Sequence, residues 1–437
     1  MKHNLNKRMS ANPNPATVKC TIHTHQDAKS LEQVKAVYRI LSNKRDTSIQ
    51  GAAGTGKTTL IKLLSERLKV TSKGRRDVIV LGTTGVASDI NRGMTVHRFL
   101  SRKHKLCKPN SIVVIDEVSM MNTDLANKVW KWRRWHRERK HGDITLVFMG
   151  DMQQLPPVEG FPFYTSAYYQ NLMKLGALNS VVLTKQHRIK DDRLHAIVND
   201  IREIKWTPRL DEVFYGHYER SVMNSRRKLH VCGRNADVDA INKESFERSV
   251  PFPITIKGVT VGLGCPVMVT ENITREGRLV APNGMIGTVD GIDGDNKWVS
   301  VRRDDDRSKV IKIPLLKHRK VVHGNEKVVM PLKLAYAITV HKLQGATIKN
   351  RQLVIDFDNA GVWQIEQLYV LFTRCEYLDQ LEITCKNIER IKRLFDPPKD
   401  KVARADLQQR VAYLDQLRKM AGHQTDKFME DKEFITL

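Results

Sequence analysis

The chain has 437 residues, 41% hydrophobic and 28% charged, so it has room for about three domains that each bury a core. Its 74 Lys and Arg against 48 Asp and Glu leave a net charge of +26, which favours a polyanionic partner because each neutralised phosphate releases a condensed counterion. An anionic membrane surface is the competing partner, but no apolar run approaches the ~20 residues of a spanning helix, so we expect nucleic acid and no membrane.

The N-terminal part of the chain contains a polar arm and a helix. Residues 1–27 lack the apolar core of a signal peptide, which predicts a flexible arm and a cytoplasmic protein. The six cysteines are scattered without a C-x-x-C pair, which favours reduced thiols over a disulfide framework or a zinc site. A helix is predicted from Ser30 to Leu41. Its Gln33 is either a surface glutamine or, because it precedes a phosphate loop, a side chain that reads an adenine edge.

A phosphate-binding pattern follows this helix. Residues Gly51–Thr59 have the spacing G-x-x-x-x-G-K-[ST], between a predicted strand and an amphipathic helix. The glycines let backbone N–H groups curl around a phosphate chain, Lys57 reaches the outer phosphates, and the Thr58 hydroxyl can ligate Mg²⁺. The strand–loop–helix context argues against a chance match. The predicted nucleotide-binding residues of the loop are Gly51, Ala53, Gly54, Thr55, Gly56, Lys57, Thr58 and Thr59.

The next apolar strand is Asp77–Gly82, a continuous run typical of a buried parallel sheet. Thr84 lies just past its carboxyl end, where open α/β sheets place ligands. His97 then precedes a short basic stretch, residues 102–105. This stretch is either a solvated loop or an edge that contacts phosphates.

A second buried strand, Ser111–Ile115, ends at the carboxylates Asp116 and Glu117. Two carboxylates at a strand end are common, but downstream of a phosphate loop they are the expected second half of a nucleotide site. Asp116 can hold Mg²⁺, and Glu117 can orient and deprotonate the attacking water.

A helix is predicted from Thr123 to about His141, with Leu125, Val129, Trp132 and His136 on one face and basic residues between them. Trp and Arg together are typical of base stacking and phosphate contact. A packed helix with a basic solvated back is an equally good interpretation, so both stay open.

Two more strands are predicted in this half of the chain. The strand Ile144–Gly150 runs into Gln154, which could sense a γ-phosphate by hydrogen bonding. The strand Val181–Arg188 ends in basic residues.

A second α/β unit begins near the strand Lys228–Cys232 and resumes after Leu334. Between them, short alternating strands and Gly-rich turns predict an antiparallel β insertion, with a hairpin tip at Arg302–Arg307. Past Pro397, the residues Leu407, Val411, Leu414 and Leu417 predict an amphipathic helix packed back on the body.

In this order, the segments resemble the motifs of the superfamily 1 helicases, most closely the RecD-like and Dda-like B group. Asp116–Met120 resembles the family's D-E-x-S-M, and Gly150–Gln154 its G-D-x-x-Q. Thr339–Gly345 is similar to T-x-H-K-x-Q-G, and Tyr369–Arg374 to Y-V-A-x-S/T-R. Several of these motifs are weak singly, but eight in the right order, from Gln33 to Arg374, are highly specific.

The resemblance implies an α/β fold with two tandem RecA-like domains, parallel sheets flanked by helices, and a small β-rich insertion in the second. The implied domains are an arm (1–27), the first RecA-like domain (28–190), the second (191–256 and 334–396), an SH3-like insertion (257–333), and a C-terminal helix and tail (397–437). The interval from Phe99 to Ile112, where family members often carry a β-hairpin wedge, is very short here.

The resemblance also implies roles for single residues. Arg188 and Arg374 would reach the γ-phosphate, Gln344 and Gly345 would complete the nucleotide site, and Thr84, His97, Thr339 and His341 would contact the DNA strand. The implied cofactors are ATP and Mg²⁺, and the implied catalytic residues are Lys57, Glu117, Gln154, Arg188 and Arg374.

The implied function is an ATP-driven 5′→3′ helicase on single-stranded DNA and duplex junctions. We expect a monomer, with room for a protein partner from replication or recombination. The alternatives are a phosphate-loop ATPase that loads or remodels a protein on DNA and a basic binder without enzymatic activity. A simple binder would need neither the carboxylate pair nor two arginines.

Overall fold

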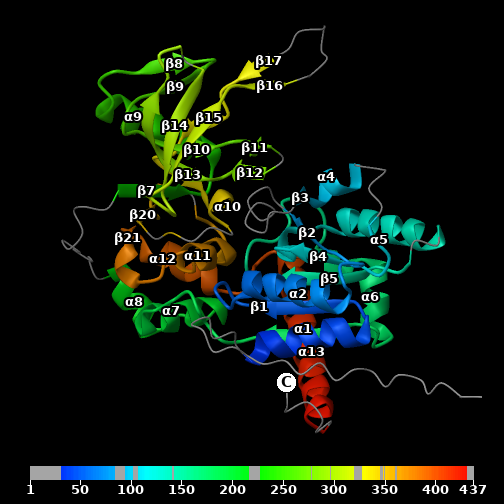
Figure 1. The fold of residues 1–437 in the computed structure, drawn as a ribbon. Helices are drawn as coiled ribbons and strands as arrows, with labels where there is room; N and C mark the ends of the chain where they lie inside the picture. The colour runs from blue at the N-terminus through cyan, green and yellow to red at the C-terminus, as the bar shows by residue number, and fades with distance from the viewer. Residues whose placement is uncertain are drawn as a thin grey trace, which may run out of the picture.

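Three bodies make up the molecule, and Figure 1 shows the β-rich one above the second of two α/β domains. The computed structural model describes residues 31–83, 94–101, 107–139, 142–215, 227–276, 278–295, 297–318, 327–344, 348, 350–359 and 362–430. No helix within these ranges is long and apolar enough to cross a membrane.

The first α/β domain is built on a six-stranded parallel sheet in the order β3-β2-β4-β5-β1-β6. Its strands are β1 (Thr47–Gly51), β2 (Val78–Gly82), β3 (Met94–Thr95), β4 (Ile112–Asp116), β5 (Thr145–Gly150) and β6 (Asn179–Leu183). Both faces are covered, which explains why β4 is apolar without interruption. Val113 and Ile115 face one core cluster, and Ile112 and Val114 face the other.

Helices cover the two faces of this sheet. One core cluster joins the sheet to α1 (Leu31–Asn43) and α2 (Lys57–Thr71). The other joins it to α4 (Val96–Ser101), α5 (Thr123–Glu138) and α6 (Ala167–Lys174). The helix α5 was expected to run to about His141, and in the structure it ends at Glu138.

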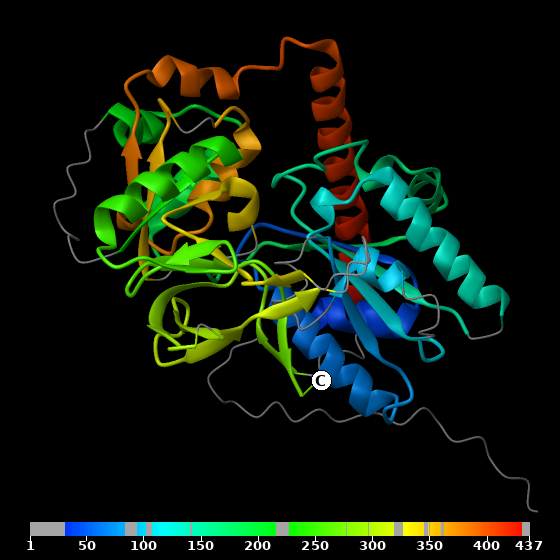
Figure 2. The ribbon, with the colours of Figure 1, turned by 90° about the horizontal axis from the view of Figure 1, so that it is seen from above.

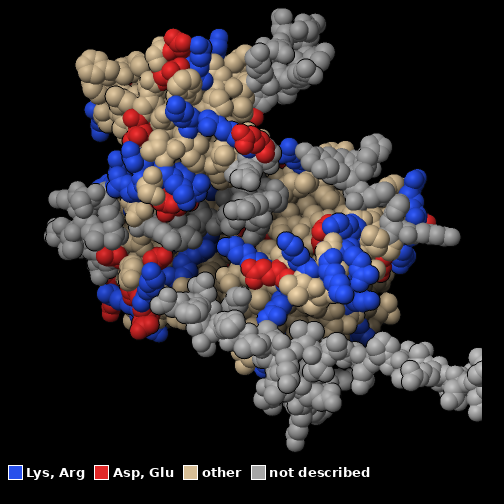
Figure 3. Space-filling model, viewed as in Figure 1, with Lys and Arg blue, Asp and Glu red and all other residues tan. Residues whose placement is uncertain are grey.

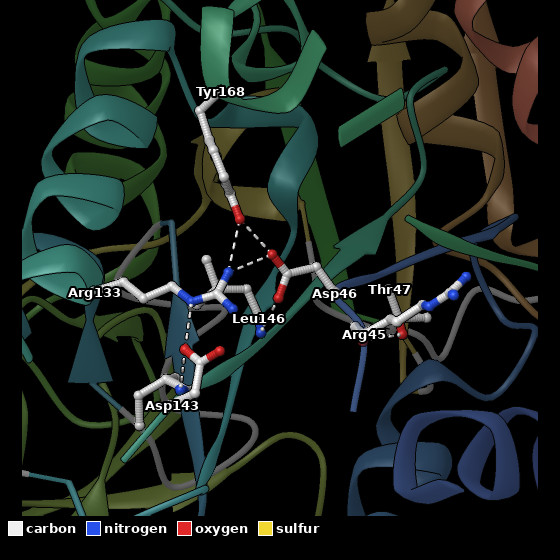
Figure 4. A network of polar contacts seen from close by, with 8 residues as sticks. Arg45, Asp46, Thr47, Arg133, Asp143, Leu146 and Tyr168 are labelled. Carbon is white, nitrogen blue, oxygen red and sulfur yellow. Dashed lines mark hydrogen bonds and ion pairs between the residues drawn. The ribbon is translucent and has the colours of Figure 1, made fainter. Parts of the chain in front are cut away.

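A buried polar network ties α5 and α6 to the start of β1. Figure 4 shows the Arg133 guanidinium between Asp46, Tyr168 and Asp143. Arg133 Nη1 lies 2.5 Å from Asp46 Oδ2, and Asp46 Oδ1 accepts a hydrogen bond from the Leu146 amide at 2.9 Å. The network satisfies a carboxylate that would be costly to bury alone.

The aromatic rings of α5 are also used within the protein. Trp130 stacks on Tyr168 with ring centroids 3.5 Å apart, and Trp132 packs edge-on against Phe99 at 4.9 Å. Two interpretations were left open for this helix, DNA contact and packing within the protein. The ring contacts of Trp130 and Trp132 support packing within the protein. The basic residues Lys128, Lys131 and Arg134 are exposed on the outer face.

The second α/β domain has a four-stranded parallel sheet in the order β19-β7-β20-β21. Its strands are β7 (Arg227–Cys232), β19 (Ala337–Thr339), β20 (Arg351–Asp356) and β21 (Leu381–Thr384). Its helices are α7 (Asp192–Arg202), α8 (Pro208–Tyr215), α9 (Asn235–Ser249), α10 (Val340–Leu343), α11 (Ile365–Phe372) and α12 (Ile388–Lys392). The two tandem α/β domains that the sequence predicts are thus confirmed; their exact limits stay a prediction.

The β-rich body contains a five-stranded antiparallel sheet in the order β15-β14-β13-β10-β18. These strands are β10 (Pro266–Val269), β13 (Ile286–Ile292), β14 (Trp298–Arg303), β15 (Val310–Pro314) and β18 (Leu332–Leu334). Its hairpins are β8 (Ile254–Ile256) with β9 (Val259–Val261), β11 (Ile273–Arg275) with β12 (Arg278–Ala281), and β16 (Leu316–His318) with β17 (Lys327–Val329). The predicted tip at Arg302–Arg307 lies at the turn between β14 and β15. The SH3-like character of this body stays a prediction.

The last helix, α13 (Lys401–Glu430), leaves the second α/β domain and runs along the first, as Figure 2 shows from above. Tyr413 and Leu417 are buried in the core of the first domain. The prediction of a helix packed on the body is correct, but its buried residues differ from those expected. Val411 is exposed and Tyr413 is buried, because the helix turns its aromatic side chain toward the ring of Tyr164.

Candidate active site

The phosphate loop lies between the end of β1 and the start of α2, as its sequence predicts. Gly54 and Gly56 have φ angles of +89° and +83°, a region that favours glycine. A Cβ at Gly54 would also collide with Gln186, and one at Gly56 with Gln33. The loop therefore needs both glycines, and α2 directs its amino-terminal N–H groups, beginning near Thr58, toward the loop. Thr59 on the next position is exposed.

Lys57 is buried inside its own loop. Its Nζ donates to Gly51 O at 2.7 Å and to Ala52 O at 3.1 Å. Burial lowers the pKa of Lys57, while the nearby carboxylates of Glu117, Asp151 and Asp116 act in the opposite direction. These acidic neighbours favour the charged ammonium that a phosphate ligand requires.

The carboxylate pair lies at the end of β4, beside the loop. Asp116 Oδ1 accepts the Glu117 amide at 2.9 Å, and Thr83 Oγ1 donates to Glu117 O at 2.8 Å. Glu117 has a φ of +52°, which is strained for a residue with a Cβ and is typical of functional sites. Its carboxylate reaches the second domain, where Gln344 Nε2 lies 3.5 Å from Glu117 Oε2.

The segment after β6 wraps around the phosphate loop instead of continuing as a strand. The strand predicted to run to Arg188 ends at Leu183. Gln186 Nε2 donates to Ala53 O at 2.8 Å, and the His187 amide donates to Gly54 O at 2.9 Å. These bonds take the place of a sheet ladder, and they fix Arg188 at the mouth of the loop.

Two arginines lie close together here, the half-buried Arg188 beside the loop and the buried Arg374 in the second domain. Arg188 Nη1 donates to Thr373 O of the second domain at 3.0 Å, and Arg374 Nε donates to Val370 O at 3.1 Å. Burial, and next the charge of Arg374, lower the pKa of Arg188 to about 9. Burial also lowers the pKa of Arg374. Two guanidinium groups close together favour an anionic ligand between them.

Several buried polar atoms around the loop lack hydrogen-bond partners among the described residues. They include Ser119 Oγ, Gln154 Oε1 and Gln344 Oε1. Leaving such an atom unsatisfied costs about 1–3 kcal/mol, so a polar ligand is the natural complement. The glycine cradle, the two arginines and these atoms fit a nucleoside triphosphate. The Thr58 hydroxyl and the Asp116 carboxylate supply hard oxygen atoms, the kind of ligand that Mg²⁺ takes.

Gln33 is buried, not on the surface, with 2% of its area exposed. Its Nε2 donates to Gly56 O at 3.2 Å, so the amide supports the loop. Reading of an adenine edge by Gln33 stays a prediction.

The predicted strand-contacting residues lie on both α/β domains. His97 is exposed on α4 of the first domain. Thr339 caps α10 of the second domain by accepting the Lys342 amide, and His341 on the same helix is half-buried, which lowers its pKa. Thr84 and Gly345 lie outside the described residues. Figure 3 shows lysine and arginine side chains gathered at the foot of the β-rich body and over the first α/β domain.

One buried contact near the loop joins two residues for which the motifs predict no separate role. Tyr369 Oη donates to Asp151 Oδ2 at 2.8 Å, and Arg202 Nη2 lies 3.7 Å from Asp151 Oδ1. Asp151 and Tyr369 stand inside recognised motifs, but nothing in their spacing pairs them.

Comparison with known proteins agrees with this geometry. Residues 29–213 match the family model of the AAA domain. The chain is 25% identical over 399 residues to the ATP-dependent DNA helicase Pif1 of Bdellovibrio bacteriovorus, covering 80% of this chain and 86% of that protein. It is 27% identical over 407 residues to the ATP-dependent DNA helicase PIF1 of Xenopus laevis, covering 81% of this chain but 61% of that protein.

Solved structures show the same fold. Pif1 helicase from Bacteroides in complex with ADP-AlF3 and ssDNA superposes with a TM-score of 0.65 at 23% identity, covering 87% of this chain and 96% of that one. Pif1 helicase from Candida albicans gives 0.66 at 20% identity, covering 83% and 96%. The tandem RecA-like fold and the superfamily resemblance read from the motifs are both confirmed. The chain is thus similar to the Pif1 helicases over most of its length, and its motifs resemble those of group B of superfamily 1.

Proposed function

We propose that this protein is an ATP-dependent DNA helicase that moves 5′→3′ along single-stranded DNA and unwinds the duplex at a junction. The observation that carries the proposal is the split site. Lys57 lies in the phosphate loop of the first domain, and the buried Arg374 of the second domain shares its acidic neighbours Glu117 and Asp151. Arg188 bridges the two domains through Thr373 O.

Each of these residues has a role in hydrolysis of the γ-phosphate. Lys57, Arg188 and Arg374 stabilise the charge that develops on the transferred phosphoryl group, and arginines placed in this way contribute about 10³–10⁵ in rate. Glu117, held in position by its strained backbone, removes a proton from the attacking water. Gln154 faces the γ-phosphate and senses its presence.

Thr58 and Asp116 would hold Mg²⁺ at the loop. When bound, Mg²⁺ neutralises part of the phosphate charge and makes the terminal phosphorus easier to attack. Asp116 is kept in place for this by the Glu117 amide that its carboxylate accepts.

Hydrolysis is coupled to movement because the site is completed only when the two domains are together. Gln344 reaches Glu117, and Arg188 reaches Thr373 O, across the boundary between the domains. His97 lies on one domain, and Thr339 and His341 lie on the other. Opening and closing would therefore change the spacing of the strand contacts and advance the protein along DNA.

The DNA track, the direction and the setting rest on family likeness and charge. The relatives are named as ATP-dependent DNA helicases, and one solved relative was crystallised with ssDNA. The net charge of +26 suits a phosphodiester track. The 5′→3′ direction follows from group B. A monomer in the cytoplasm, with a replication or recombination partner, completes the proposal.

A strand-displacement assay tests the proposal most directly. Duplexes that carry a 5′ or a 3′ single-stranded tail are incubated with ATP and Mg²⁺, and ATP hydrolysis is followed with and without single-stranded DNA. We expect displacement from the 5′-tailed substrate and hydrolysis stimulated by DNA. Stimulated hydrolysis without displacement would instead favour a protein loader or remodeller. Equal hydrolysis with and without DNA would contradict a translocase.

A further inference from the structure

A segment of the first α/β domain is embedded in the second, directly beside the phosphate loop. Asp151 follows β5 and is 1% exposed. Its Oδ2 accepts from Tyr369 Oη of α11, and its Oδ1 faces Arg202 of α7. Both partners belong to the second domain, so one buried carboxylate is held by two side chains across the domain boundary.

The residues that follow Asp151 strengthen this attachment. Gln153 Oε1 accepts from Arg202 Nε, and Gln153 Nε2 donates to Arg202 O at 2.9 Å. Leu155 belongs to the main hydrophobic core of the second domain. The segment from Asp151 to Leu155 is therefore attached to the second domain, although it continues from a strand of the first.

Tyr369 also lies close to the phosphate loop. Its side chain is 1% exposed, and its hydroxyl is near enough to the Ala53 amide of the loop for that amide to act against the rise of the Tyr369 pKa. Burial, and next the charge of Asp151, raise the pKa of Tyr369 well above its ordinary value, which favours the protonated hydroxyl that donates to Asp151. It stands between two anionic acceptors, the carboxylate of Asp151 and any phosphate that occupies the loop.

We propose that the Tyr369 hydroxyl binds the terminal phosphate and that this binding changes the contacts at the domain boundary. The inference rests on the proposed function, since it needs a triphosphate in this loop. A phosphate oxygen near Ala53 competes with Asp151 for the Tyr369 hydroxyl. When the phosphate takes the hydroxyl, Asp151 keeps Arg202 and the Gln153 amide, which donates to Asp151 Oδ1 at 3.3 Å. The contact of Asp151 with the second domain is then made by α7 instead of α11. A diphosphate lacks the terminal group and leaves the Tyr369–Asp151 bond in place.

The test measures nucleotide affinity without turnover. A fluorescent non-hydrolysable ATP analogue and the matching fluorescent ADP are titrated with Mg²⁺ into the full chain and into Tyr369→Phe. The variant keeps the buried ring and loses only the hydroxyl. We expect it to bind the triphosphate roughly tenfold more weakly, the scale of one hydrogen bond to a charged group, with ADP affinity unchanged. Tyr169→Phe, which removes a buried hydroxyl that bonds to Tyr413, is the matched control and should change neither affinity.

A second variant, Asp151→Asn, tests whether Asp151 and the phosphate compete for the Tyr369 hydroxyl or whether the charge of Asp151 simply repels the phosphate. It also gives a second measurement if Tyr369→Phe folds poorly. The amide oxygen of asparagine is a weaker acceptor than the carboxylate, so the hydroxyl is given up to the phosphate more easily and the affinity for triphosphate relative to ADP should rise. In the double variant with Tyr369→Phe this gain should be lost. An equal gain with and without the hydroxyl would mean that Asp151 only repels phosphate, and it would overturn the inference.

The remaining outcomes are also decisive. Equal weakening of ADP and triphosphate by Tyr369→Phe would assign the hydroxyl a purely structural role and overturn the inference, while leaving the helicase proposal intact. If the unmodified chain bound neither nucleotide, the proposed function itself would fail.

Discussion

The position of Glu117 on the backbone is the clearest sign of chemistry at the scale of a single residue. Its φ of +52° places a side chain with a Cβ in a region that usually belongs to glycine, and a strained conformation of this kind costs roughly 1–3 kcal/mol. Thr83 stabilises this conformation. Its hydroxyl donates to the carbonyl of Glu117, and its amide donates to the carbonyl of Asp116. The carboxylate thereby reaches Gln344 of the second domain.

Glu117→Gln should therefore remove the proton acceptor and leave the geometry in place. We expect DNA-stimulated ATP hydrolysis to fall by about 10²–10⁴, the usual contribution of a general base, with nucleotide affinity little changed. Single-turnover hydrolysis and equilibrium titration measure the two quantities separately. Glu138→Gln, on the exposed end of α5, is the matched control. A variant at Glu117 that hydrolyses ATP at the full rate would show that another group activates the water.

At the scale of elements, α13 is the least local part of the fold. Its Tyr413 stacks on Tyr164 with ring centroids 4.4 Å apart, and its hydroxyl lies 2.8 Å from that of Tyr169. Ser180 Oγ donates to Leu417 O at 2.8 Å, and Arg410 pairs with Glu366 of the second domain. A helix that leaves one domain thus completes the core of the other.

Tyr413→Ala should destabilise the first α/β domain by about 3–5 kcal/mol, the usual loss for a buried aromatic ring. Val411→Ala, on the exposed side of the same helix, should change stability by less than about 0.5 kcal/mol. Hydrogen exchange resolved by segment measures the effect on β6 and α6 directly, which avoids assuming a two-state transition in a multidomain chain. Equal protection in both variants would mean that α13 is only loosely attached.

The elements also show what sequence patterns can and cannot predict. The phosphate loop and the strand that ends at Asp116 were predictable because their chemistry is local. The end of β6 was predicted too late, because Gln186 bonds to the loop carbonyl of Ala53, a tertiary contact that overrides the apolar pattern. Helical periodicity predicts α13, but it predicts that Val411 is buried, whereas the structure buries Tyr413. Periodicity alone does not show which face of a helix packs against the rest of the protein.

Contacts between distant motifs lay beyond the sequence altogether. Tyr369 and Asp151 are 218 positions apart, and Gln344 and Glu117 are 227 apart. Motif order indicated that such residues gather at one site, but only the packing of the two domains pairs them.

At the scale of the whole molecule, the charge that binds DNA and the site that hydrolyses ATP are separate. The net charge of +26 is spread over the chain, whereas Lys57 is 9% exposed and bonded to its own loop. Lys57→Ala should therefore abolish hydrolysis and leave single-stranded DNA affinity, measured without nucleotide, within about twofold, since an exposed phosphate contact is not lost. Titrations from low to high salt extend the test, because the slope of log affinity against log salt reports the number of neutralised phosphates. An unchanged slope is expected for Lys57→Ala. A slope that falls by about one unit would place Lys57 on the DNA and contradict its assignment to the nucleotide.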